Sequence, residues 1–230
     1  MKITWFGQTC FKFSNNEVTI IVDPYDESVG LTLPDVSADI VTVSHDTLAK
    51  AKPFALPHRS WTKSEGAAKS YFAFGSDYKL LTRPGEYEIK GVFITATAIY
   101  PPDSKMTKDR SIIFTFQTGG ITLCHLGNLG HIPSQQQIKA LDNTDVLFVP
   151  VGGGCCLNAA QASEVINMIE PRLVIPMHYH IPKLTISLEP IDKFLKEMGL
   201  HQVERKSKLT ITNSNLPIET QTIILNLEVT

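Results

Sequence analysis

The segment Ile40-Val41-Thr42-Val43-Ser44-His45-Asp46-Thr47-Leu48-Ala49-Lys50 carries the strongest fold signal in the chain. Its first residues are apolar and β-branched, which predicts a buried strand. The run ends abruptly in Ser44, His45 and Asp46, so the strand delivers polar side chains to the rim of a sheet. We therefore expect a site at this edge. Asp46 either belongs to that site or caps a short helix that reaches Lys52.

Two later segments, Ile121–His131 (ITLCHLGNLGH) and Leu173–His180 (LVIPMHYH), also pass from an apolar run into polar side chains. Loops at strand ends collect functional groups on a rigid scaffold, so we expect several of them to line one cleft. These loops follow Val43, Leu123, Val149 and Ile175. The cleft candidates are Asp46, Lys50, His125, Asn128, His131 and His180.

Some of these polar residues have purely structural interpretations. His125 and His131 can be hydrogen-bonded histidines that hold the glycine-rich loop between them. Asp23, before Pro24, either accepts hydrogen bonds from backbone amides or simply ends a strand in a turn. The sequence leaves these alternatives open.

Composition excludes several classes of function. The chain has 230 residues and a net charge of −2, which gives no electrostatic footprint for nucleic acid. It shows no signal peptide and no apolar run of the roughly 20 residues that a membrane-spanning helix needs. We therefore expect a cytoplasmic protein, folded as a single domain over residues 1–230, with reduced cysteines. An oligomer remains compatible with the sequence.

Hydrophobic patterns predict the order of the elements. The residues from Ile3 to Val22 form a β-meander that Pro24 stops. Later strands alternate with helices, and the chain closes with a hairpin of Leu209–Thr212 and Thr220–Leu227. The predicted helices are Thr62–Ala73, Ser134–Leu141, Ala159–Ile169 and Ser187–Met198.

The ordered motifs resemble those of the metallo-β-lactamase-fold hydrolases, in which a strand precedes His-x-His-x-Asp-His. Pro84–Ile89 (PGEYEI), His125–His131 and Pro176–Tyr179 are similar to a bacterial branch related to ascorbate-6-phosphate lactonase-like proteins. The resemblance implies an α/β (α+β) fold, a four-layer αββα sandwich of two mixed sheets packed face to face. In that family Gly-His-x-x-Phe opens the chain, whereas Gln8 replaces the histidine here.

The family's dinuclear metal site uses seven positions, and the resemblance places them on substituted residues here. Only His45 and His178 keep a metal-binding side chain of the expected kind; a neutral asparagine, Asn128, replaces the aspartate that lies between the two metals. The seven positions are His45, Thr47, Ala49, Lys50, Pro101, Asn128 and His178. Lys50 would place an ammonium where a cation should sit.

The resemblance therefore implies a hydrolase-like protein that has lost the dinuclear centre, with no cofactor, and that binds a small-molecule ligand or partner or performs metal-independent chemistry. Lys50 could hold an anionic group of that ligand. The alternative is a mononuclear hydrolase of a lactone, ester or phosphoester, with one Zn or other divalent metal. Asp46, His180 or Cys155 would then be the third ligand beside His45 and His178.

Nucleophilic chemistry has two candidate sources in the sequence. Ser44, His45 and Asp46 are consecutive, which argues against a convergent triad. Cys155 or Cys156 could act as a nucleophile if His178 or His180 lies close, although adjacent buried cysteines are usually inert.

Overall fold

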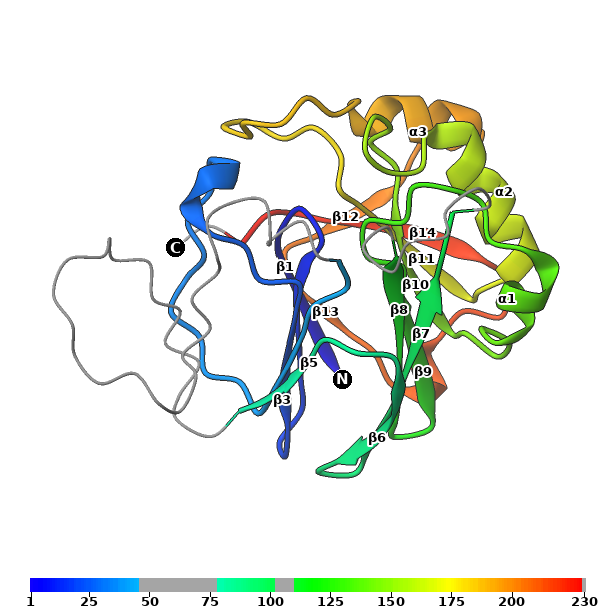
Figure 1. Ribbon diagram of the computed structural model, residues 1–230. Helices are drawn as coiled ribbons and strands as arrows, with labels where there is room; N and C mark the ends of the chain where they lie inside the picture. The colour runs from blue at the N-terminus through cyan, green and yellow to red at the C-terminus, as the bar shows by residue number, and fades with distance from the viewer. Residues whose placement is uncertain (46–77, 102–109, 229–230) are drawn as a thin grey trace, which may run out of the picture.

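Two β-sheets face one another in the computed structural model, which describes residues 1–45, 78–101 and 110–228 (Figure 1). The first sheet has the order β13-β1-β2-β3-β4-β5. Its strands β1, β2 and β3 form the predicted antiparallel meander, and β4 and β5 add to it in parallel. The strands are β1 (Lys2–Gly7), β2 (Cys10–Ser14), β3 (Thr19–Val22), β4 (Ile40–Thr42), β5 (Lys79–Leu81) and β13 (Leu209–Thr210).

The second sheet has the order β12-β14-β11-β10-β9-β8-β7-β6 and is also mixed. The strands β9, β10 and β11 run parallel, so their carboxyl ends and the loops that follow share one edge. The strands are β6 (Gly85–Ile89), β7 (Val92–Ile99), β8 (Ser111–Thr118), β9 (Ile121–His125), β10 (Val146–Pro150), β11 (Leu173–Met177), β12 (Glu204–Lys206) and β14 (Gln221–Leu225).

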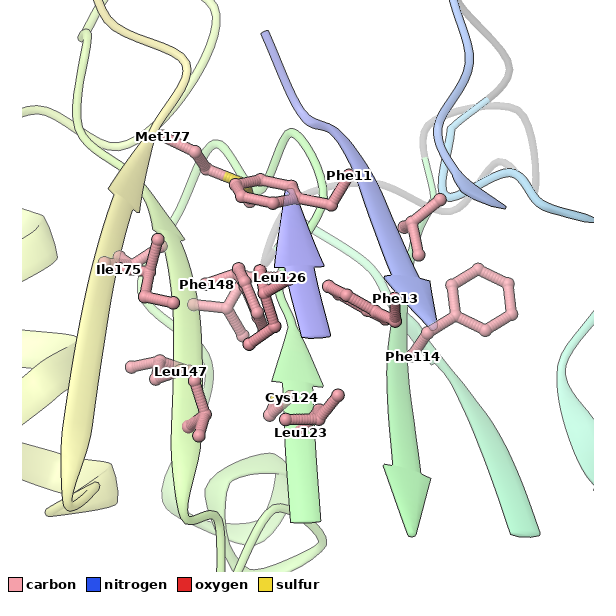
Figure 2. Packing of buried hydrophobic residues seen from close by; sticks show 14 of the residues in the cluster. Phe11, Phe13, Phe114, Leu123, Cys124, Leu126, Leu147, Phe148, Ile175 and Met177 are labelled. Carbon is pink, nitrogen blue, oxygen red and sulfur yellow. The ribbon is translucent and has the colours of Figure 1, made fainter. Parts of the chain in front are cut away.

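Aromatic side chains fill the space between the two sheets. Phe11 and Phe13 on β2 lie over Phe148 on β10, with ring centroids 4.7 and 4.9 Å apart (Figure 2). Phe13 also meets Phe116 on β8 at 5.5 Å. All four side chains are fully buried, and each contributes on the order of 2–3 kcal/mol through removal of its surface from water. This interlayer core holds the strand ends of both sheets in fixed relation.

Helices cover the outer face of the second sheet, on the side away from the first (Figure 1). They are α1 (Gln135–Lys139), α2 (Ala159–Ile169) and α3 (Ile191–Glu197). Helix α2 has the predicted bounds, and a capping box forms between Asn158 and Gln161. The mixed α/β architecture with two sheets is the predicted one. The helix predicted over Thr62–Ala73 lies outside the described residues.

Two element predictions were wrong. The predicted helix from Ser187 begins instead at Ile191, because Glu189 donates its amide to Gly152 O and accepts from His180 N, which ties this stretch into loops. The predicted closing hairpin does not form: β13 pairs with β1, whereas β14 inserts in parallel between β11 and β12. Alternating apolar residues predict a strand but not its partner.

In the part of the chain that the structure describes, no helix has the length and apolarity needed to span a membrane.

Candidate functional site

A cavity of about 260 Å³ opens at the strand ends where the two sheets meet. Its walls come from the loops after β1, β3, β4, β9, β10 and β11, so both sheets contribute. This is the convergence of strand-end loops that the sequence predicts. We call it the strand-end cavity; its lining residues are Gln8, Thr9, Asp23, Pro24, Tyr25, Asp26, Ser28, Val29, His45, Asn128, Cys155, His178 and Ile186.

The carboxylate of Asp23 joins the end of β3 to the end of β4. Its Oδ1 accepts a hydrogen bond from the Ser44 amide at 2.6 Å, and its Oδ2 accepts one from Ser44 Oγ at 2.6 Å. Ser44 Oγ also lies 2.9 Å from His45 Nδ1. Asp23 therefore accepts a hydrogen bond from a backbone amide, as one of the two interpretations of the sequence proposed. Through Ser44 it also positions His45 at the cavity.

Ser44 and His45 are in contact, but the predicted absence of a triad with Asp46 stays a prediction. Ser44 is nevertheless fully buried and bonded to Asp23, so its hydroxyl is not open to a substrate. Asp46 lies outside the described residues. Ser44 is thus a structural link rather than a nucleophile.

His178 enters the cavity from the end of β11 on a constrained backbone. Its φ is +54°, a region that non-glycine residues seldom occupy, and its amide donates to Gln8 O at 3.1 Å. Gly152 packs against it so closely that a Cβ there would lie 2.2 Å from His178 O. The pKa of His178 is lowered to about 4, mainly because the ring is buried and to a smaller extent because His45 lies nearby. The imidazole is therefore neutral near pH 7.

Cys155 lies beside this imidazole. Its Sγ is 3.5 Å from His178 Nε2, and the residue is exposed. The expectation that both adjacent cysteines are buried holds for Cys156 alone, whose thiol pKa burial raises to about 12.

Three buried polar atoms at the cavity have no hydrogen-bond partner among the described residues. They are Gln8 Nε2, Asn128 Oδ1 and His178 Nδ1. An amide nitrogen donates and an amide oxygen accepts, so the cavity offers both kinds of group. Buried polar groups are nearly always paired, which indicates a polar species as their natural partner.

His125 lies beneath the cavity rather than in it. The ring is fully buried, its Nε2 lies 2.9 Å from Thr9 O, and its Nδ1 accepts from the Gly127 amide at 3.2 Å. Burial lowers the pKa of His125. This is the structural role that the sequence alternative described, in which the histidine holds the glycine-rich loop.

The other two described candidates, His131 and His180, do not line the strand-end cavity. His131 is partly buried, hydrogen-bonds the backbone of Tyr100 and has a pKa that burial lowers. His180 is exposed, and its backbone amide donates a hydrogen bond to Glu189 O at 2.9 Å. Lys50, with Thr47 and Ala49, lies outside the described residues, as Asp46 does.

Sequence reasoning missed one wall of the cavity. Tyr25, Asp26, Ser28, Val29 and Ile186 carry no motif and are brought in by the 3₁₀ turn Glu27–Val29 and by the loop before α3. That loop is bound to the turn, since Thr185 N donates to Val29 O at 3.1 Å and Thr185 Oγ1 to Ser28 O at 2.8 Å. These hydrogen bonds join residues more than 150 positions apart, so no local sequence pattern predicts them.

Most of the chain matches a known protein family. The family described as "Beta-lactamase superfamily domain" matches residues 2–178, which includes both sheets' strand ends and the cavity histidines. The chain belongs to this family.

Relatives and solved structures agree with that assignment. A UPF0173 protein of Pyrococcus abyssi is 29% identical over 184 residues, covering 78% of this chain and 83% of the relative. A UPF0173 metal-dependent hydrolase of Methanosarcina mazei is 24% identical over 196 residues, covering 78% of this chain and 84% of the relative. The relatives thus include archaeal proteins, so the expected bacterial branch is too narrow.

The solved structures include a crystal structure from Thermotoga maritima, of a protein assigned to the Zn-dependent hydrolases of the metallo-β-lactamase superfamily. It is 32% identical, covers 97% of both chains and has a TM-score of 0.72. This similarity confirms the metallo-β-lactamase-like fold that the sequence predicts.

Within the ranges that the structure describes, the donor set does not fit the superfamily's dinuclear centre. Among the described residues, no group of three His, Cys, Asp or Glu side chains is placed to hold a metal ion. At the positions that the resemblance assigns to ligands, Pro101 has no side-chain lone pair and Asn128 has no charge. His45 and His178 remain, and three strong ligands are the minimum for catalytic zinc.

Proposed function

We propose that this chain is a metallo-β-lactamase-fold hydrolase relative that has lost the dinuclear metal centre and binds a small polar ligand in the strand-end cavity. The observation that carries the proposal is the donor set: His45 and His178 are retained, while neutral or cationic residues stand at the other family positions. Two divalent ions close together need anionic oxygens to offset their charge, and Asn128 supplies none.

The cavity itself supports ligand binding. Its volume of about 260 Å³ is at the small end for ligand pockets, which suits a molecule smaller than most drugs. Pro24, Tyr25 and Val29 line it with apolar surface, while Gln8 and Asn128 offer an unpaired donor and acceptor. A compact ligand with a carbonyl or carboxylate oxygen and a neighbouring N–H or O–H would satisfy both.

A mononuclear hydrolase of a lactone, ester or phosphoester is the second candidate. One observation favours it: Cys155 Sγ and His178 Nε2 are 3.5 Å apart, close to the roughly 3.6 Å that tetrahedral zinc imposes on a sulfur and a nitrogen ligand. The names of the relatives, which include metal-dependent hydrolases, point the same way. A third ligand would still have to complete the set.

Metal content separates the two candidates. We expect purified protein, dialysed against zinc and then against buffer, to retain less than about a tenth of an equivalent, because two histidines bind too weakly. Elemental analysis of the wild type beside the His45→Ala/His178→Ala variant gives the measurement. Equal zinc in both proteins is bound elsewhere and supports the proposal. Stoichiometric zinc in the wild type that the variant loses would establish the mononuclear hydrolase instead.

A further inference from the structure

We propose that Cys155 and His178 form a thiol–imidazole pair that cleaves small acyl esters through a thioester, without a metal. This inference rests on the proposed loss of the dinuclear centre, because a metal on His178 Nε2 would occupy the nitrogen that faces the thiol. The two groups come from different loops, after β10 and after β11, and meet with Sγ 3.5 Å from Nε2. That separation is within reach for transfer of the thiol proton.

The scaffold fixes both partners. The Cys155 loop is closed by hydrogen bonds from Gly153 N to Leu157 O at 3.0 Å and from Cys156 N to Gly153 O at 3.3 Å. His178 is held through its amide by Gln8 O, and its ring is 6% exposed. The base is therefore buried and oriented, while the sulfur remains open to a ligand.

The cavity supplies the third requirement, a donor for the oxygen that gains negative charge. Gln8 is 5% exposed, lines the same cavity, and its Nε2 has no partner among the described residues. A buried amide donor left unpaired near a nucleophile can bind a carbonyl oxygen and stabilise the tetrahedral intermediate. Cys156 is a contrast, since its Sγ faces Gly153 O and Leu157 O and lies outside the cavity lining.

The reaction balances with water as the co-reactant. His178 Nε2 takes the thiol proton while Cys155 Sγ bonds to the acyl carbon. The bond from that carbon to the leaving oxygen breaks, and the proton on Nε2 passes to this oxygen, which releases an alcohol. Water then attacks the thioester and gives a proton to Nε2, the carbon–sulfur bond breaks, and the sulfur regains its proton as the carboxylic acid leaves.

The probe for this chemistry is p-nitrophenyl acetate, mixed with chelator-treated protein whose metal content has been measured. We expect a burst of p-nitrophenolate close to one equivalent and an acetyl group on Cys155, located by mass spectrometry of peptides. Cys155→Ser should reduce the burst by about tenfold or more, and His178→Asn should slow acylation by about a hundredfold through loss of the base. Cys156→Ser is the matched control and should retain the burst. Circular dichroism checks that each variant is folded.

The outcomes separate the two proposals. A burst that survives in Cys155→Ser, or metal-free wild type with no acetyl group on Cys155, overturns the thiol mechanism and leaves the proposed loss of the metal centre intact. A burst that appears only after zinc is added overturns the proposed loss of the metal centre itself. Acetyl transfer to Cys155 in metal-free protein that depends on His178 supports both.

Discussion

Replacing Asp23 with alanine is expected to lower the free energy of unfolding by about 3 kcal/mol. The Asp23 side chain is 2% exposed and accepts hydrogen bonds from the amide and the hydroxyl of Ser44. Without the carboxylate, the Ser44 amide stays buried and unpaired at the end of β4, at about 1–3 kcal/mol, and the Ser44 hydroxyl keeps only its contact with His45 Nδ1. Asp23 also has a φ of +47°, which alanine tolerates less well than aspartate or asparagine.

Urea unfolding of a short variant series measures this effect. Asp23→Asn keeps an oxygen for the Ser44 amide and keeps the tolerance of positive φ, so we expect a loss of about 1 kcal/mol. Asp35→Ala, at an exposed aspartate, should change stability by less than about 0.5 kcal/mol. If Asp23→Ala unfolds with the same midpoint as Asp35→Ala, the bridge between β3 and β4 does not stabilise the fold.

Acidification from pH 7 to pH 4 is expected to cost about 3 kcal/mol of stability through His178 alone. The pKa of His178 is lowered to about 4 in the folded protein, against an ordinary value of 6.5. Well above pH 6.5 neither state is protonated, and His178 leaves stability unaffected. Between these values the unfolded state binds a proton that the folded state refuses, so unfolding becomes easier as the pH falls.

Comparing urea unfolding between pH 7 and pH 4 isolates this contribution. His178→Asn removes the titrating group while suiting the positive φ, so its stability should fall by about 3 kcal/mol less than that of the wild type over the same range. His201→Asn, at an exposed histidine, should follow the wild type. Parallel curves for the wild type and His178→Asn would show that His178 is not held neutral by burial.

The two-sheet fold was expected from the resemblance of the ordered motifs to the metallo-β-lactamase-fold hydrolases, and most of its strands were predictable because they are locally distinct. Buried runs such as Ile40–Thr42 and Val146–Pro150 are apolar and end in glycine or polar residues, and helix α2 carries its own capping box. Strand pairing is a different kind of information. The partner of β14 is set by packing between β11 and β12, and nothing in residues 221–225 alone distinguishes that position from a hairpin.

The site was predictable where residues follow a strand and unpredictable where distant loops meet. The resemblance placed His45 and His178 at the site as retained ligand positions, each follows a buried run, and both line the cavity. Cys155 was one of two candidate thiols, and only the folded backbone brings it to His178 across 23 positions. Gln8 lies in the turn Gly7-Gln8-Thr9 with a φ of +53°, and this conformation leaves its amide donor unpaired at the cavity. The sequence indicates a turn there but not the unpaired donor.

The central claim is that the strand-end cavity no longer holds the superfamily's pair of divalent ions. The most direct measurement is anomalous diffraction at the zinc edge from crystals grown with added zinc. Our account predicts no ordered peak within coordination distance of both His45 and His178, and solvent or a polar ligand contacting Gln8 Nε2 and Asn128 Oδ1. Two strong peaks about 3.5–4 Å apart beside these histidines would contradict it.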